Sequence, residues 1–255
     1  MRSRYVDIDD RSEDLRDLLA DEPEVAQDFG LKYEVSWLYH DCALEGVVLT
    51  GPEMVQALTR QPVAEATAVS LYREVQNHKA AIDYVRAEAG AKKLRINLTV
   101  IKKIYEILGA GIEGRSTAEY RKDIPLHRAY FHEIAPPAKI GFLLGKLVDF
   151  CESSEFKSYH PIQKASRVSH GFMQAYPFTE NSGKVARLLA NLVLLHHGYL
   201  PCIIHATDRQ RYYESLRAPE GALRDLMLDA MENGIVNAEK YVRAALEQRA
   251  KKAAR

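Results

Sequence analysis

The sequence predicts an all-α fold. Apolar residues recur every three or four positions along most of the chain, which is the spacing of one helix face. Runs of this kind include Val100–Leu108, Ile140–Val148 and Leu188–Leu195. Alternation of apolar and polar residues, the mark of a strand, is nearly absent, and glycines and prolines separate the helical runs. We therefore expect a helical bundle.

The composition is that of an ordinary globular protein. Of the 255 residues, 47% are hydrophobic and 27% are charged, which excludes fibrous, disordered and membrane-spanning classes. Lys and Arg together equal Asp and Glu, 35 against 35, so no net charge attracts the chain to nucleic acid or to an anionic membrane. We expect neither as a partner.

The cysteines and the N-terminus favour a cytoplasmic protein. Cys42, Cys151 and Cys202 are an odd number at wide spacing and form no zinc-binding pattern, so we expect reduced core thiols. The first residues alternate in charge where a secretory signal would be apolar.

One stretch does not fit the helical pattern. Residues 122–139 mix prolines, aromatics and histidines without a helical period, which suits an extended loop or a small β-hairpin. We interpret it as a binding flap.

The segment most suggestive of chemistry runs from His160 to Leu200 and predicts a helix, a tight loop and a second helix. Pro177 ends the first helix, and the second begins near Ser182. Unpaired backbone N–H groups and the helix dipole make such a helix start an anion site. Gly183 allows close approach, and Lys184 and Arg187 add two cations.

Glu180 in the same loop is suited to hold Mg²⁺ that bridges a polyphosphate. The alternative is an N-capped core helix, with Asn181 or Ser182 as the cap and solvated charges beside it. A Walker loop is excluded, because Phe178 stands where its first glycine would be and no hydroxyl residue follows Lys184.

The segment Tyr176–Arg187 (YPFTENSGKVAR) resembles the Fic family motif, HPFx(D/E)GNGRxxR, at five positions. These are Pro177, Phe178, Glu180, Gly183 and Arg187. The likeness covers residues 34–217 and implies the Fic fold, a helical bundle around this anion site with a β-hairpin flap. Residues 1–33 are then an N-terminal helical extension and residues 218–255 are C-terminal helices. We expect the apolar side of these last helices to pack on the main domain, with a homodimer interface as the alternative.

A second resemblance lies upstream. Tyr39–Thr50 is similar to the inhibitory helix of regulated Fic proteins, (S/T)xxxE(G/N), with Glu45-Gly46 matching and Asp41 in place of the hydroxyl residue. A helix over 35–46 would end with Glu45 against the negative end of its own dipole, so that a cationic partner would stabilise it. The resemblance implies that this partner is Arg187, with Glu45 as a regulatory residue.

Fic enzymes mostly transfer AMP from ATP to a protein hydroxyl. The resemblance therefore implies ATP or another nucleotide as ligand, Mg²⁺ on Glu180, and a protein target aligned on the flap around 127–135 as an added strand. It also implies phosphate contacts and a nucleoside pocket, made by Asn181, Ser182, Gly183, Lys184, Arg187, Asn191, Tyr212 and Tyr213.

The sequence departs from the motif where the chemistry lies. Tyr176 replaces the family's catalytic histidine, and a tyrosine, with a pKa of about 10, is a poor general base at neutral pH. Asn181 and Ser182 replace glycine and asparagine and add side chains to the loop. Lys184 replaces an arginine, exchanging a bidentate fork for a point charge.

Two hypotheses follow, and we favour the first. The chain is a divergent Fic-fold protein, a pseudoenzyme that binds a nucleotide or phosphate without ordinary AMP transfer. Alternatively, it is an active transferase of altered chemistry that moves AMP or another phosphate-bearing group to a protein hydroxyl. A scaffold that holds a partner protein on its flap is a third class.

Overall fold

The computed structural model describes residues 2–59, 66–113, 115, 117–125, 132–219 and 221–253. Within these ranges the regular structure is helical and no strand occurs, so the predicted all-α class is confirmed. In chain order the helices are α1 (Arg2–Asp21), α2 (Pro23–Leu44), α3 (Gly51–Leu58), α4 (Ala66–Ala89), α5 (Leu98–Leu108), η2 (Pro137–Lys139), α6 (Ile140–Glu152), α7 (Ser154–Ser158), α8 (Pro161–Ala175), α9 (Ser182–His196), η3 (Ala206–Asp208), α10 (Arg209–Arg217) and α11 (Gly221–Ala253).

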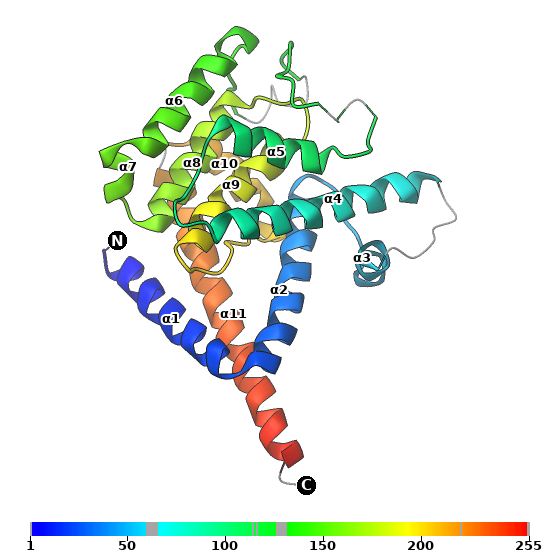
Figure 1. Cartoon of the computed structure of the whole chain (residues 1–255), viewed down its shortest axis with the longest axis vertical. Coiled ribbons are helices and arrows are strands. Elements are labelled where there is room, and N and C mark those ends of the chain that lie inside the picture. Colours follow the sequence, from blue (N-terminus) through cyan, green and yellow to red (C-terminus); the bar gives the residue numbers. More distant parts are fainter. Residues whose placement is uncertain are drawn as a thin grey trace.

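Helix α9 is the centre of the bundle. Its residues from Ser182 to Leu194 are all buried, which requires neighbours on every side. Helices α4, α5 and α8 pack around it, with α8 as its main partner, and α6 covers the outer side of α8 (Figure 1). The loop that joins α8 to α9 therefore lies at one end of the most buried helix pair.

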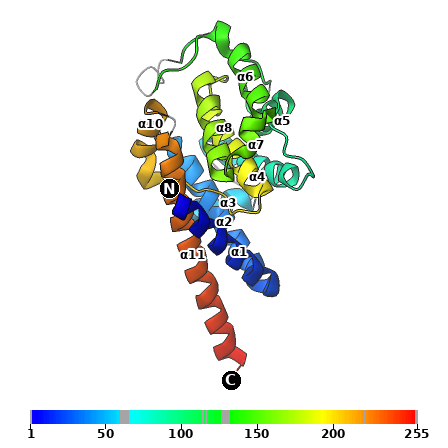
Figure 2. The same cartoon turned by 90° about the vertical axis from the view of Figure 1, so that its left-hand side faces the viewer.

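Helices α1, α2 and α11 build an extension below this bundle (Figure 1). They share a small apolar cluster of their own: Leu15, Val25, Phe29, Ala238 and Val242. Figure 2 shows α11 continuing away from the main body toward the C-terminus.

The C-terminal half of α2 reaches the main core, where Trp37, Leu38 and Leu44 are fully buried. The sequence placed the start of the Fic-like domain at residue 34, which is a position inside α2. The apolar side of α11, including Leu223, Leu226 and Met227, packs on the main bundle.

The centre of the expected flap, residues 126–131, lies outside the described residues. Its described ends form no strand, and Pro137–Lys139 form the short helix η2. Arg121 holds these ends to the C-terminus of α8: its guanidinium donates to the carbonyls of Tyr176, at 2.7 Å, and of Ala135. The flap base and the motif loop are thus joined by one buried side chain.

No helix in the described part of the chain combines the length and the apolar character needed to cross a bilayer.

Phe178 anchors the motif loop in the core. Its ring is fully buried and stacks on Tyr105, with ring centroids 3.9 Å apart. We expect Phe178→Ala to lower the free energy of unfolding by about 3–5 kcal/mol, because it leaves a cavity. Urea denaturation measures the change, and Phe142→Ala, at a side chain that is 63% exposed, is the control that should change stability by less than about 0.5 kcal/mol. Equal effects would show that the loop is not anchored by this ring.

Candidate functional site

The motif loop begins with a left-handed residue. Tyr176 is the C-cap of α8 with φ 42°, and its N–H donates to the carbonyl of Phe172 at 2.8 Å. A bulky residue rarely adopts this conformation, so the surrounding structure has to impose it. The Arg121 guanidinium on the Tyr176 carbonyl, together with the Arg121 N–H on the Pro177 carbonyl at 2.8 Å, supplies this constraint.

The two extra side chains in the loop are accommodated without loss of the turn. Asn181, at the glycine position of the motif, has φ 58°, and asparagine is among the residues that tolerate this region best. The hydroxyl of Ser182 is buried, accepts from the Phe178 N–H at 3.0 Å and donates to the Phe178 carbonyl at 2.8 Å. The side chain of Ser182 therefore closes the loop on itself.

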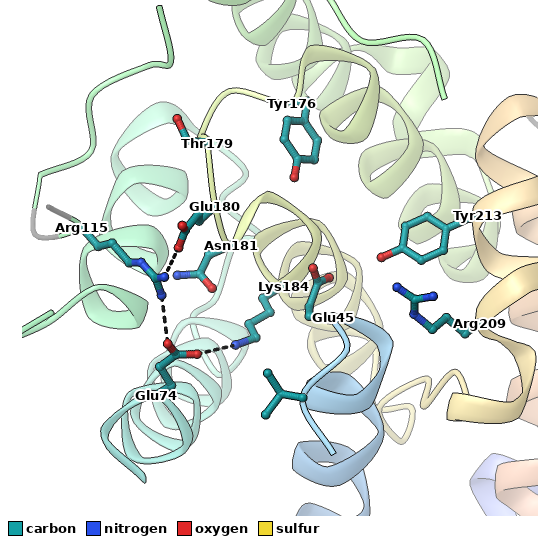
Figure 3. Close-up of a pocket in the computed structure, with 11 residues that line it drawn as sticks. Glu45, Glu74, Arg115, Tyr176, Thr179, Glu180, Asn181, Lys184, Arg209 and Tyr213 are labelled. Carbon is teal, nitrogen blue, oxygen red and sulfur yellow. Dashed lines mark hydrogen bonds and ion pairs between the residues drawn. The ribbon is translucent and has the colours of Figure 1, made fainter. Parts of the chain in front are cut away.

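A cavity of about 360 Å³ opens at this loop and at the N-terminus of α9 (Figure 3). The residues that line it come from α4, the loops after α2 and α5, the motif segment and α10: Glu45, Val47, Glu74, Arg115, Tyr176, Thr179, Glu180, Asn181, Lys184, Arg209 and Tyr213.

Tyr176 occupies the position where the motif has its histidine, and its hydroxyl points into the cavity (Figure 3). The ring is 1% exposed. Among the described residues, no histidine lines this cavity. His132 packs edge-on against the Tyr176 ring with centroids 6.2 Å apart, and its Nε2 donates to the Met173 carbonyl at 2.9 Å. His170 lies on α8 and lines a different cavity.

The charged side chains on one wall neutralise one another (Figure 3). Arg115 forms ion pairs with Glu180 and, at 3.0 Å, with Glu74. Lys184 lies 4.0 Å from the other oxygen of Glu74. A phosphate or a metal ion that used Lys184 or Glu180 would compete with these internal partners.

Glu45 fills the opposite wall, at the end of α2. It is the C-cap of that helix and precedes Gly46, which has φ 88°, as the sequence predicted for a glutamate before a glycine cap. Its Oε1 accepts from Nη1 of Arg187 at 2.9 Å. A methyl group on Gly183 would collide with the same Oε1, so the carboxylate lies directly against the start of α9.

Arg187 has a second carboxylate partner that the sequence did not predict. Its Nε donates to Oδ1 of Asp41, and both side chains are 5% exposed. Asp41 and Glu45 are four residues apart and therefore lie on the same face of α2. The other oxygen of Asp41 lies 3.0 Å from Nε2 of the fully buried His78.

The protonation states of this buried group follow from its contacts. Burial alone would raise the pKa of Asp41, but Arg187 and His78 outweigh it and lower the pKa to about 2. Burial would likewise lower the pKa of Arg187, whereas Asp41 and Glu45 raise it well above its ordinary value. Burial lowers the pKa of His78. Asp41 and Arg187 are thus a charged pair at neutral pH.

Residues 95–194, which include the motif segment and both flanking helices, match the Fic/DOC family. The chain thus carries a Fic/DOC family domain. It is 25% identical to protein adenylyltransferase Fic of Drosophila virilis over 190 residues, 73% of this chain and 38% of that protein. It is 24% identical to the protein of the same name from Aedes aegypti over 193 residues, 74% of this chain and again 38% of the relative.

Solved structures share the Fic fold. A Fic domain-containing signaling protein from Bacteroides thetaiotaomicron superposes with a TM-score of 0.81 at 19% identity, over 94% of this chain and 97% of that one. Fic-1 from C. elegans superposes with a TM-score of 0.74 at 20% identity, over 97% of this chain and 73% of that one. The match extends beyond residues 95–194 to nearly the whole chain, including most of the N- and C-terminal helices.

Six of the eleven site residues predicted from the Fic resemblance line the cavity: Glu45, Tyr176, Glu180, Asn181, Lys184 and Tyr213. Ser182, Gly183 and Arg187 adjoin it through the motif loop and Glu45 without lining it, and Asn191 and Tyr212 have other partners. Asn191 is buried along α9, and its side-chain oxygen accepts from the Cys202 N–H at 2.8 Å. Tyr212 is fully buried below Arg187, whose guanidinium lies 5.6 Å from the Tyr212 ring centre. Nucleoside contacts of these two residues stay predictions.

Three charged residues of the site were missed by sequence analysis. Glu74 lies on α4, Arg115 in the loop after α5, and Arg209 at the start of α10. Arg209 donates to the Leu44 carbonyl at 2.9 Å, and thereby holds the end of α2 against α10. No local motif marks these positions.

Glu180 could hold Mg²⁺ only together with a polyphosphate. The described residues contain no cluster of three or more His, Cys, Asp or Glu side chains that could bind a metal ion. Mg²⁺ is commonly held by one or two carboxylates plus substrate phosphates, and Glu180, 45% exposed at the cavity, fits that role once Arg115 releases it. The metal would then neutralise phosphate charge.

Acid should weaken the fold through His78 and Asp41. The lowered pKa of His78 stabilises the folded protein above about pH 6.5, and that contribution is lost as the pH falls further. The lowered pKa of Asp41 contributes stability above about pH 4 that is lost as the pH falls to about 2. Urea unfolding at pH 7, 5 and 3 should show both losses.

Asp41→Asn separates the two contributions. At pH 7 we expect it to cost about 3–5 kcal/mol, because Arg187 loses a buried partner. The difference from the native protein should shrink as the pH approaches 2, since the carboxyl of native Asp41 then becomes protonated as well. A difference that stays constant with pH would contradict an ionised Asp41.

Proposed function

We propose that this chain is a Fic-fold protein that binds a nucleotide or a phosphate-bearing ligand at the α9 N-terminus and lacks ordinary protein AMP transfer. The observation that carries the proposal is the Glu45 carboxylate, which lies against Gly183 and pairs with Arg187 where an anionic ligand would bind. A helix start that accepts a carboxylate has the chemistry to accept a phosphate.

The lack of a general base among the described residues that line the cavity supports the proposal that the chain does not carry out ordinary AMP transfer. Tyr176 is at the histidine position, and no histidine of the described chain lines the cavity. The carboxylates that line it are all engaged: Glu45 with Arg187, and Glu74 and Glu180 with Arg115. An attacking hydroxyl would therefore find no group ready to take its proton.

The alternative, a transferase of altered chemistry, has one observation in its favour. The Tyr176 hydroxyl points into the same cavity as Glu180 and Lys184 (Figure 3). A cation close to a phenol lowers its pKa, and a tyrosinate could then act as a base. ATP or another nucleotide would be the donor, and a protein segment aligned along the flap would be the acceptor. The chain spans less than two fifths of the length of the curated relatives it matches.

Removing the Glu45 carboxylate should expose the anion site. We expect Glu45→Gly to bind ATP with Mg²⁺ at least about tenfold more tightly than the native chain, because a charged hydrogen bond of Arg187 becomes available to phosphate. Titration calorimetry measures the affinity. Glu45→Gln is the matched control that keeps the shape and removes only the charge, and it should also bind more tightly. Unchanged affinity in both variants would contradict gating by Glu45.

The same titration tests the phosphate ligands. In the Glu45→Gly background, Arg187→Ala and Glu180→Ala should each weaken binding of ATP with Mg²⁺ by about tenfold or more, since each removes a charged contact. If neither substitution matters, the loop is a scaffold and the nucleotide site is wrong.

Transfer of labelled AMP to proteins decides between the two functions. We expect no transfer from ATP labelled on the α-phosphate by the native chain or by Glu45→Gly, and measurable transfer by Glu45→Gly/Tyr176→His, which restores a base. Transfer by Glu45→Gly that is lost in Glu45→Gly/Tyr176→Phe would establish the alternative, because only the phenol differs between these two proteins.

A further inference from the structure

A second cavity, of about 190 Å³, lies at the other end of the α8–α9 helix pair. It is enclosed by residues 93–96, the end of α6, α7, the first turn of α8 and the end of α9. Lys164 in this cavity and Tyr176 at the Fic cavity are twelve residues apart along α8, a rise of about 18 Å at about 1.5 Å per residue. The two cavities are therefore separate sites.

Lys164 is the decisive residue of this second cavity. It is 9% exposed, and no carboxylate of the described chain pairs with its ammonium group. Its Nζ lies over the face of Phe156, 5.8 Å from the ring centre. The side chain is largely buried, and this burial lowers the pKa of its ammonium group.

The rest of the cavity is also positive. Lys93 and Lys157 stand at its rim, and the single carboxylate, Glu152, is paired with Lys93 at 3.0 Å. Two lysines, Lys157 and Lys164, are thus left to face an incoming anion.

His197 adds a hydrogen-bond acceptor. Its Nδ1 lies 2.8 Å from the Val193 carbonyl, which only accepts, so Nδ1 carries a proton. Burial lowers the pKa of His197, so the ring is neutral at pH 7 and its Nε2 is an acceptor. A ligand that carries both a negative oxygen and an O–H group matches this pair of lysines and this histidine.

We propose that this cavity binds a small oxyanion of the phosphate class, with Lys164 as its main ligand and Lys157 and His197 as supporting groups. Its volume is below the roughly 300–1,000 Å³ of sites for drug-sized ligands, so the ligand is inorganic phosphate or a small phosphomonoester rather than a nucleotide. The site is independent of the function proposed for the Fic cavity.

Phosphate titration followed by amide NMR shifts tests this site on the full chain. We expect inorganic phosphate to shift amides of residues 93–96, 156–164 and 196–197. Lys164→Met should weaken that binding by about tenfold or more, since a charged hydrogen bond is lost. Lys184→Met, which removes a cation of the Fic cavity, and Lys103→Met on the exposed side of α5 are the matched controls and should leave it unchanged. Loss in Lys184→Met with full binding in Lys164→Met would overturn the proposal, as would the absence of shifts in this region.

Titrations with two other anions test which groups of the ligand the cavity recognises. Sulfate lacks an O–H group at neutral pH and should bind about fivefold more weakly than phosphate, because the His197 acceptor stays unused. Equal affinities would remove His197 from the site. Phenyl phosphate separates free phosphate from a phosphomonoester: tighter binding than phosphate favours an ester, and exclusion favours the free ion.

Folding of Lys164→Met provides its own check. Without phosphate, the variant should unfold at the same temperature as the native chain or at a higher one, because Lys164 forms no ion pair whose loss would leave another charge unpaired. Added phosphate should then raise the unfolding temperature of the native chain and of Lys103→Met but not of Lys164→Met. A phosphate-free Lys164→Met that is strongly destabilised would show that Lys164 has a structural role, and would contradict the site.

Discussion

The buried guanidinium of Arg187 is the group on which the arrangement around the Fic cavity depends. Arg187 lies on α9, which other helices surround. Its positive charge therefore has to be balanced by carboxylates inside the protein. Helix α2 brings both carboxylates, Asp41 and Glu45, one turn apart on one face. The position of α2 is therefore fixed by a charge on another helix as well as by its apolar residues. Helices α1 and α11, which pack on the N-terminal half of α2, then hold it from the far side.

The two cavities along the α8–α9 pair differ in how their charges are satisfied. In the Fic cavity, Arg187, Arg115 and Lys184 each face a carboxylate of the same chain. A ligand there has to replace existing partners, so its apparent affinity is reduced by the work of separating them. In the second cavity, Lys164 has no such partner among the described residues, and an anion would add an interaction without breaking one.

Local signals in the sequence predicted the helical class, the loop between α8 and α9, and Glu45 at the end of a helix before a glycine. These features depend on helical spacing, on breakers and on a capping residue, all of which are written within a few positions. The sequence could not show that Asp41, rather than only Glu45, pairs with Arg187, because residues 41 and 187 meet only through the packing of α2 on α9. The ion pair between Glu74 and Arg115 also joins residues that only the folded structure brings together. Likewise, it took the structure to show that Asn181 adopts the left-handed conformation of the glycine it replaces, and that the Ser182 hydroxyl closes the loop.

The two carboxylates of α2 differ in how much of the surrounding structure holds them. Asp41 lies within the hydrogen-bonded helix, one turn after the fully buried Trp37 and Leu38, so it can leave Arg187 only if a packed segment opens. Glu45 follows the last helical residue and precedes a glycine, in the part of a helix that frays at low cost in hydrogen-exchange experiments. Glu45 is thus held by the end of α2, whereas Asp41 is held by its packed interior. A ligand that displaces Glu45 needs to move only this capping residue, while Asp41 inside the helix stays paired with Arg187.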